Sequence, residues 1–143
     1  MADAASRDDA VAGGARPQAI IVGAGPAGLA VAACLERRGA PYVLLERAPR
    51  VADTWRRHYD RLHLHTHKRN SSLPYAPWPR SAPAYPARDD VVAYLEAYAA
   101  ALAASPRLSE AVEQAVRQGD GWQVGTARSR YLAPHLVVAS GLN

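Results

Sequence analysis

Residues 18–46 read QAIIVGAGPAGLAVAACLERRGAPYVLLE, and this stretch decides the fold. The apolar run at residues 19–22 predicts a buried strand, and the apolar run at residues 42–45 predicts a second one. Between them a glycine-rich turn leads into a helix, because small or apolar residues recur at i, i+3, i+4 and i+7: Gly28, Val31, Ala32 and Leu35. Gly39 is placed to end this helix. The order strand, turn, helix and strand is typical of the first unit of a dinucleotide-binding domain.

Each glycine of the turn has a separate role in such a unit. Gly23 lets the chain turn sharply after the strand, Gly25 leaves room for a pyrophosphate, and Gly28 lets helix and strand pack closely. Pro26 suits the first helical turn, because that position needs no N–H partner. Backbone N–H groups at the helix N-terminus, around Ala27, are therefore expected to hold the phosphates.

The acid at the end of the second strand completes the pattern. Glu46 follows Gly28 by 18 residues, where a carboxylate can accept hydrogen bonds from ribose hydroxyls. A GxGxxG pattern alone is weak evidence, because glycine turns also join strands to helices in domains that bind nothing. The flanking strands, the helix and the acid together favour a nucleotide site over a purely structural turn.

Composition sets further bounds on the protein. The chain has 143 residues, about one domain, and a formal net charge of +4 with its arginines dispersed, which argues against a nucleic-acid partner. The single cysteine, Cys34, excludes an internal disulfide and is expected to be a small apolar core residue. Residues 1–17 lack a periodic apolar face and are predicted to be a disordered leader. No segment resembles a signal peptide or a membrane span, so we expect a cytoplasmic protein.

The rest of the chain predicts a long loop, a helix and a small antiparallel set of strands. Residues 47–87 carry six prolines and are expected to be mainly extended loop. Within this loop we predict a helical turn at residues 54–58 and a half-exposed strand at residues 61–66. A helix follows with Asp89 or Asp90 as N-cap, and Pro106 stops it; its expected apolar face is Val91, Tyr94, Leu95, Tyr98 and Leu102.

The expected strands of the last part are residues 113–118, 122–127 and 135–139, with a turn at residues 119–121 between the first two. Three histidines, His63, His65 and His67, alternate and would share one side of a strand, as metal ligands could. No acid or cysteine lies within that run. We therefore interpret them as ordinary polar histidines and predict no metal site.

Several motifs resemble those of a known family. Glu46 is followed, after five residues, by Ala52-Asp53-Thr54-Trp55, where flavin-containing monooxygenases have Gly-Gly-x-Trp and their plant auxin subclass has alanine at the first glycine. Further stretches that match the plant subclass are TyrAspArgLeu at 59–62, His65, Lys68, LeuPro at 73–74, TyrPro at 85–86 and TyrLeuGluAlaTyrAla at 94–99. Residues 18–143 thus resemble the FAD-binding portion of the YUCCA-type indole-3-pyruvate monooxygenases.

The resemblance implies a set of cofactor contacts. By resemblance the three glycines hold the FAD pyrophosphate, Glu46 binds the adenosine ribose, and Arg47 lies near the adenine. Trp55 would border the flavin. His65, which stands where the plant subclass has histidine, would face the isoalloxazine ring. Lys68 matches a family lysine to which we assign no role, and no catalytic residue can be assigned.

The resemblance also implies a fold and a function. We expect an α/β, Rossmann-like FAD-binding domain, a parallel sheet with a small antiparallel insertion, at residues 18–143. The family enzyme uses FAD and NADPH to convert indole-3-pyruvate, a 2-oxo acid, to indole-3-acetate in auxin biosynthesis. Its second glycine turn for NADPH and its closing segment have no counterpart here, and its Ala-Thr-Gly segment appears as Ala139-Ser140-Gly141. We therefore expect a partial FAD domain without the NADPH-binding domain.

Two hypotheses follow from this. The chain is an incomplete monooxygenase that keeps the FAD site, or it is a non-catalytic nucleotide-binding or interaction fragment that associates with full-length relatives. A simple NAD dehydrogenase is disfavoured, because Trp55 follows Glu46 at the flavin-family spacing and because the later strands do not repeat the βαβ unit.

Overall fold

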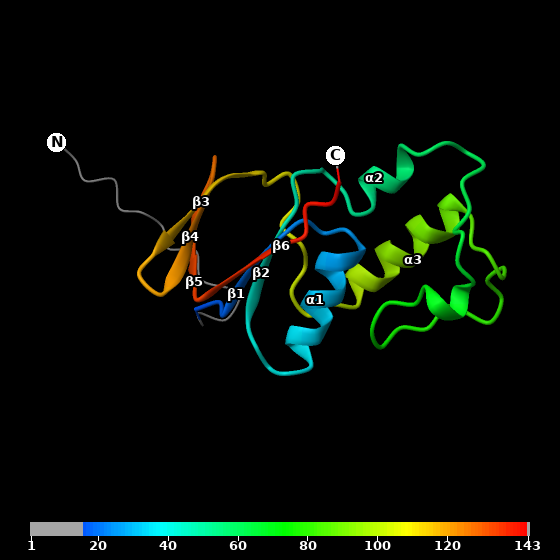
Figure 1. The fold of residues 1–143 in the computed structure, drawn as a ribbon, viewed down its shortest axis with the longest axis horizontal. Coiled ribbons are helices and arrows are strands. Elements are labelled where there is room, and N and C mark those ends of the chain that lie inside the picture. The colour runs from blue at the N-terminus through cyan, green and yellow to red at the C-terminus, as the bar shows by residue number, and fades with distance from the viewer. Residues whose placement is uncertain (1–15, 143) are drawn as a thin grey trace.

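The computed structural model describes residues 16–142. The predicted leader at residues 1–17 therefore lies almost wholly outside the described residues. In chain order the elements are β1 (Ala19–Val22), α1 (Pro26–Glu36), β2 (Tyr42–Leu45), α2 (Asp53–Arg56), the 3-10 helix η1 (Lys68–Asn70), α3 (Arg88–Ala100), β3 (Val112–Gln118), β4 (Gly121–Thr126), β5 (Arg130–Ala133) and β6 (His135–Val138). Figure 1 shows the antiparallel strands at one end of the molecule and α3 at the other, with α1 between them.

A parallel three-stranded sheet with the order β2-β1-β6 forms the centre. Ala19 of β1 is aligned with Tyr42 of β2 on one side and with His135 of β6 on the other. The first strand is apolar throughout because both of its faces are covered. Ile21 belongs to a core shared with α1 and α3, whereas Ile20 belongs to a second core shared with the antiparallel strands. The α/β class and the parallel sheet with an antiparallel addition are confirmed.

The antiparallel sheet has the order β3-β4-β5 and covers the face of β1 opposite the helices. The strands predicted at 113–118 and 122–127 are confirmed to within a residue or so. β5 was not predicted, because only Pro134 separates it from β6 and the two read as one short apolar segment. Its Tyr131 is aligned with Val124 of β4, and both side chains are buried.

The strand predicted at residues 61–66 is wrong. The structure has only a single bridge there, between His63 and Ala87. Leu64 N–H donates to the Pro86 carbonyl at 2.8 Å, but the proline nitrogen has no hydrogen to donate back, so the ladder does not propagate. The helical turn predicted at 54–58 is present, one residue earlier, as α2.

The second long helix begins earlier than predicted. Its N-cap is Ala87 and neither Asp89 nor Asp90, because the carboxylate of Asp90 reaches back and accepts the Ala87 N–H at 2.9 Å. α3 ends at Ala100, before Pro106 is reached. Of its predicted apolar face, Val91, Leu95 and Tyr98 are buried in the helix, Tyr94 is half-buried, and Leu102 is buried just beyond the helix end. Among the described residues, no helix has the length and hydropathy needed to cross a bilayer.

Candidate functional site

A cleft of about 560 Å³ lies over the carboxyl ends of the parallel strands. The chain passes from β1 to β2 on one side and returns last to β6 on the other, so the strand order reverses at β1. Open α/β sheets bind their ligands at such a reversal. The lining residues come from five segments: 22–27, 45–47, 52–55 with Arg57, 110–112 and 139–142.

Two glycines of the turn are required by the fold. Gly23 has a φ of +103°, and a Cβ there would lie 2.4 Å from the carbonyl oxygen of Ala139 in the segment after β6. A Cβ on Gly28 would lie 1.8 Å from the carbonyl oxygen of Gly23. Backbone atoms cannot move aside as a flexible side chain can, so both positions need glycine for the turn and helix to pack.

Gly25 is different, because the fold does not require it. Its φ of −78° is open to any residue, and a Cβ there would meet nothing within 4 Å. Gly25 also lines the cleft. The space that a side chain would take is therefore open to a group that approaches the backbone closely, as a pyrophosphate does in this kind of turn.

The N-terminus of α1 adjoins this space. The first helical hydrogen bond runs from Leu29 N–H to the Gly25 carbonyl at 3.0 Å, so the N–H groups of Ala27 and Gly28 precede the helical ladder. In the described part of the chain no side chain caps α1, and its first turn carries no acid. The partial positive charge of the helix end is thus free for an external anion.

Glu46 stands at the end of β2 beside the glycine turn. One carboxylate oxygen accepts the Ala24 N–H at 2.7 Å, and the other accepts the Ala48 N–H at 2.9 Å. Each carboxylate oxygen has a second lone pair, so both can still accept a ribose hydroxyl. The backbone of Glu46 also pairs with Arg107 and Glu110, which covers the outer edge of β2.

Of the remaining predicted cofactor contacts, some line the cleft and others do not. Arg47 and Trp55 line the cleft; Arg47 is exposed, and Trp55 is half-buried with its ring 5.6 Å from that of His58. His65 is exposed and is not among the residues that line the cleft. Lys68 has a structural part, because its Nζ donates to the carbonyl oxygens of Pro79, Arg80 and Ala82 and so ties together the proline-rich loop.

The histidine run does not form a ligand set. The backbone bends at residues 65–66, so the three side chains do not share one face of a strand. His63 Nδ1 lies 2.8 Å from the Arg61 carbonyl oxygen, and His67 Nδ1 accepts the Arg69 N–H at 3.2 Å. Within residues 16–142 no group of three or more His, Cys, Asp or Glu side chains is placed to hold a metal ion.

Sequence reasoning missed Glu110, a buried acid in the cleft wall. It is 7% exposed, and its carboxylate accepts hydrogen bonds from the hydroxyls of Tyr131 and Thr126. Burial and the bond to Glu110 raise the pKa of Tyr131 above its ordinary value. No motif marks Glu110. Only the pairing of residues 107–110 with β2 brings it to the cleft.

Asp53 of α2 holds two arginines at the mouth of the cleft. Its carboxylate accepts hydrogen bonds from Arg50 at 2.8 Å and from Arg57. These bonds hold the pKa of Asp53 below its ordinary value. Both arginine side chains are exposed, so salt screens the two ion pairs. We expect these pairs to contribute little to the free energy of unfolding.

Comparison with known proteins assigns the chain to a family. A family model described as pyridine nucleotide-disulphide oxidoreductase matches residues 20–142, which is most of the chain. The chain belongs to this family. Proteins similar to it include curated plant monooxygenases and solved flavin monooxygenases.

The curated relatives are named as indole-3-pyruvate monooxygenases. The chain is 50% identical over 131 residues to indole-3-pyruvate monooxygenase YUCCA1 of Oryza sativa subsp. japonica, covering 89% of the chain and 32% of that protein. It is 46% identical over 130 residues to probable indole-3-pyruvate monooxygenase YUCCA4 of Arabidopsis thaliana, covering 89% of this chain and 32% of that protein. The chain thus spans about a third of the length of these relatives. The predicted resemblance to the YUCCA-type monooxygenases is confirmed.

Solved structures agree on the fold. A flavin-containing monooxygenase from Stenotrophomonas maltophilia is 31% identical with a TM-score of 0.75, covering 87% of this chain and 38% of that one. A steroid monooxygenase described as bound to NADP is 28% identical with a TM-score of 0.78, covering 89% of this chain and 26% of that one. Over the region that it shares with these structures, the chain therefore has the fold of flavin-dependent monooxygenases.

Proposed function

We propose that this chain forms the FAD-binding part of a flavin-dependent monooxygenase that uses NADPH and converts indole-3-pyruvate to indole-3-acetate. The names of the curated relatives support the substrate and the product. Because the chain spans about a third of those relatives, the activity belongs to the proposal for the whole enzyme. The cytoplasmic location and an association with full-length relatives remain predictions.

Bound FAD would supply the redox centre through which NADPH reduces molecular oxygen. In the overall reaction the 2-oxo acid loses its carboxyl carbon as carbon dioxide, and the remaining carbonyl carbon becomes the carboxyl of indole-3-acetate. One oxygen atom of O₂ enters that carboxyl and the other leaves as water, while NADPH is oxidised. The sequence has a single GxGxxG turn, so we assign NADPH to the whole enzyme and FAD to the cleft described here.

The residues of this chain would bind and orient the cofactor. The N–H groups of Ala27 and Gly28 would hold the pyrophosphate in the space beside Gly25. Glu46 would accept the ribose hydroxyls, because its carboxylate is already fixed by two backbone N–H groups. The cleft wall continues from Glu46 through Arg47 to residues 110–112, which would surround the adenine.

The flavin end of the cofactor is less defined by this chain. Trp55, from α2, would cover one side of the flavin and exclude water from it. His65 remains the proposed polar partner of the isoalloxazine ring, from the loop beyond α2. We assign neither residue to a proton transfer.

Gly25 carries the proposal. A glycine that neither its own φ nor its neighbours require, placed at the end of the central strand, is explained by a ligand that needs the space. A matched control exists in Gly125 of β4, where a Cβ would also meet nothing within 4 Å and which lies outside the cleft.

The test compares three forms of the full 143-residue chain. Each is mixed with FAD and passed through gel filtration, and the visible flavin absorbance per protein chain is recorded together with the circular dichroism. We expect near-equal stoichiometry for the wild type and Gly125→Val, and loss of flavin from a folded Gly25→Val. Equal retention by Gly25→Val, or a folded wild type that retains no flavin, would contradict the proposal. Added NADPH then reports whether this chain alone supports reduction.

A further inference from the structure

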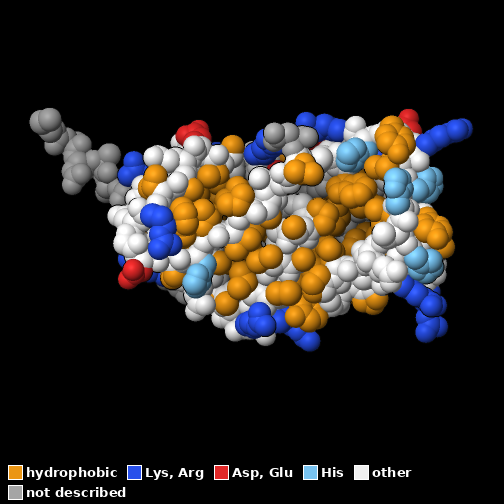
Figure 2. Space-filling view, viewed as in Figure 1, with side chains coloured by type: hydrophobic (Ala, Val, Ile, Leu, Met, Phe, Trp, Pro, Cys, Tyr) orange, Lys and Arg blue, Asp and Glu red, His pale blue; other side chains and the backbone are white. Residues whose placement is uncertain are grey.

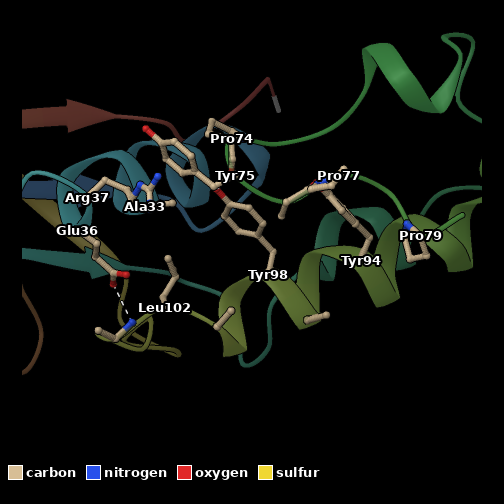
Figure 3. Close-up of a pocket in the computed structure, with 14 residues that line it drawn as sticks. Ala33, Glu36, Arg37, Pro74, Tyr75, Pro77, Pro79, Tyr94, Tyr98 and Leu102 are labelled. Atoms are coloured by element: carbon tan, nitrogen blue, oxygen red, sulfur yellow. Dashed lines mark hydrogen bonds between the residues drawn. The ribbon is translucent and has the colours of Figure 1, made fainter.

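A second pocket, of about 630 Å³, lies on the helical side of the molecule (Figure 3). It opens between the end of α1, the middle of α3 and the proline-rich loop that follows η1. None of its lining residues lines the FAD cleft. The pocket is therefore separate from the cleft described above, and nothing in the proposed function uses it.

Small side chains on the two helices leave this space open. Ala33 of α1 and Ala97 of α3 line it, together with Ala101 just after α3. The opposite wall carries flat apolar surfaces from the loop, Pro74 and Pro77. Figure 3 shows the rings of Tyr75, Tyr94 and Tyr98 around the same space. Such a lining suits a flat apolar body.

One wall of the pocket is a strained turn. The Ala76 N–H donates to the Leu73 carbonyl at 3.3 Å, which closes a four-residue turn with Pro74 second and Tyr75 third. Tyr75 has a φ of +66°. A positive φ at the third position is normal for glycine in a type II turn and unfavourable for a bulky aromatic residue. The turn nonetheless places a tyrosine ring there that is 61% exposed.

Two tyrosines of α3 hold this turn in place. The Tyr94 hydroxyl accepts the Leu73 N–H at 2.8 Å and donates to the Ala76 carbonyl at 2.5 Å, and the Tyr98 hydroxyl donates to the Pro74 carbonyl at 2.9 Å. The surrounding hydrogen bonds therefore impose the strained φ of Tyr75. The strain does not serve to bury the Tyr75 ring, which stays exposed. Strain of this kind is concentrated at ligand sites, because the fold maintains it for a purpose other than packing.

The rim of the pocket carries one cation without an ionic partner. The Arg37 guanidinium lies 4.6 Å above the Tyr75 ring, which fixes its face and leaves its N–H edge available. Within residues 16–142 no carboxylate forms an ion pair with Arg37. The acid beside it, Glu36, also lines the pocket, and its Oε1 accepts the Tyr42 hydroxyl at 2.6 Å and the Ala103 N–H at 2.8 Å. Figure 3 shows the Glu36 carboxylate on the side of Leu102 and the Arg37 side chain on the side of Tyr75.

We propose that this pocket binds a small planar aromatic carboxylate, with its ring between the tyrosine and proline surfaces and its carboxylate on the Arg37 guanidinium. Charge complementarity selects the carboxylate, since the free guanidinium edge presents paired donors to it. The flat walls select the aromatic ring over a flexible chain. The site does not depend on the FAD assignment, and the proposed function enters only in the choice of probe.

The test titrates two probes into the full, isotope-labelled chain and follows backbone amide shifts by NMR. Indole-3-acetate carries the ring and the carboxylate, and 3-methylindole carries the ring alone. We expect indole-3-acetate to shift the amides of Ala33, Ala97 and Ala101, and to bind up to about fivefold more tightly than 3-methylindole, as for an exposed charge pair.

Three variants separate the parts of the site. Arg37→Gln should weaken indole-3-acetate about fivefold and leave 3-methylindole unchanged. Arg38→Gln, its exposed neighbour outside the pocket, is the matched control and should change neither. Ala97→Trp, at an exposed position of α3, should fill the pocket and abolish both. Tyr75→Gly should weaken binding while raising the thermal midpoint, because it removes the strain.

Several results would overturn the proposal. These are the absence of shifts at millimolar probe, equal affinity for the two probes, equal weakening by Arg38→Gln, or shifts confined to Gly25 and Glu46. A concentration-dependent dimer that Ala97→Trp disrupts would instead assign the groove to a second copy of the chain. Failure here is distinguishable from failure of the FAD site, because Gly25→Val should leave indole-3-acetate binding unchanged and Ala97→Trp should leave flavin retention unchanged.

Discussion

The carboxylate of Glu46 accepts the backbone N–H of Ala24 at 2.7 Å, so the end of β2 is hydrogen-bonded directly to the glycine turn that follows β1. The same side chain accepts the Ala48 N–H with its other oxygen. One carboxylate therefore ties the glycine turn after β1 to the chain that leaves β2. The fold places Glu46 here, and only a side chain with an acceptor at both oxygens can bind the two N–H groups.

Glu46→Gln should weaken both the fold and the cofactor site. The amide keeps one acceptor but places an NH₂ donor against a backbone N–H, which leaves that N–H unsatisfied. We expect the free energy of unfolding to fall by about 1–3 kcal/mol, measured by urea denaturation, and flavin retention to fall with it. Glu113→Gln, an exposed acid on β3, is the matched control and should change neither. Equal behaviour of the two variants would contradict the role of Glu46.

Gly28→Ala should prevent the turn and helix from packing. The added Cβ would lie 1.8 Å from the Gly23 carbonyl oxygen, and that backbone atom is itself held between β1 and α1. We expect a loss of at least about 3 kcal/mol, at the upper end for overpacked sites, seen in thermal denaturation. Gly25→Ala should lose only about 1 kcal/mol or less, the usual difference at an N-cap. A Gly28→Ala protein as stable as Gly25→Ala would be inconsistent with this geometry.

Ala52 combines a strained backbone with a buried side chain. Its φ is +59°, in the left-handed region, and it is 6% exposed. Ala52→Gly removes roughly 1 kcal/mol of strain but loses a buried methyl group worth about as much, so we expect a change within about 0.5 kcal/mol. Ala52→Val should destabilise by 2 kcal/mol or more, on the order of a strained β-branched residue. Urea midpoints of the two variants test this, and a stable Ala52→Val would refute it.

Alkaline pH should destabilise the protein through Tyr98. Burial raises the pKa of Tyr98 to about 12, above its ordinary value of 10. A raised pKa means that the folded state favours the neutral phenol, so this stabilisation is complete below pH 10 and is lost as pH rises toward 12. Burial also raises the pKa of Tyr42, Tyr94 and Tyr131, which adds to the slope.

Urea midpoints between neutral pH and pH 12 measure this effect. Tyr98→Phe removes the hydrogen bond to Pro74, so it should be less stable by about 1 kcal/mol at neutral pH and show a shallower alkaline loss. Tyr59→Phe, at an exposed tyrosine, should match the wild type at every pH. An alkaline slope that Tyr98→Phe leaves unchanged would show that other tyrosines carry the effect.

The sequence predicted the elements whose signals are local. The apolar runs of β1 and β2, the glycine turn and α1 follow from residue spacing, because a buried parallel strand and an amphipathic helix impose their periods on the chain. The start of α3 was misplaced because two adjacent aspartates both suit an N-cap. Only the contact from Asp90 to the Ala87 N–H shows that both aspartates lie inside the helix and that Ala87 is the N-cap. The strand expected at residues 61–66 failed because its partner contains Pro86, which a local pattern cannot register.

By itself, the sequence determined that a dinucleotide-type unit lies at residues 18–46 and that Gly23, Gly25, Gly28 and Glu46 belong to it. The tertiary structure decided which of the three glycines the packing requires. Gly23 and Gly28 are held by backbone contacts, whereas Gly25 faces open space, and no spacing rule separates these cases. Glu110 and the strained Tyr75 turn came only from the fold. Both sites are built by segments far apart in the chain, and their contacts form only when the sheet and helices pack.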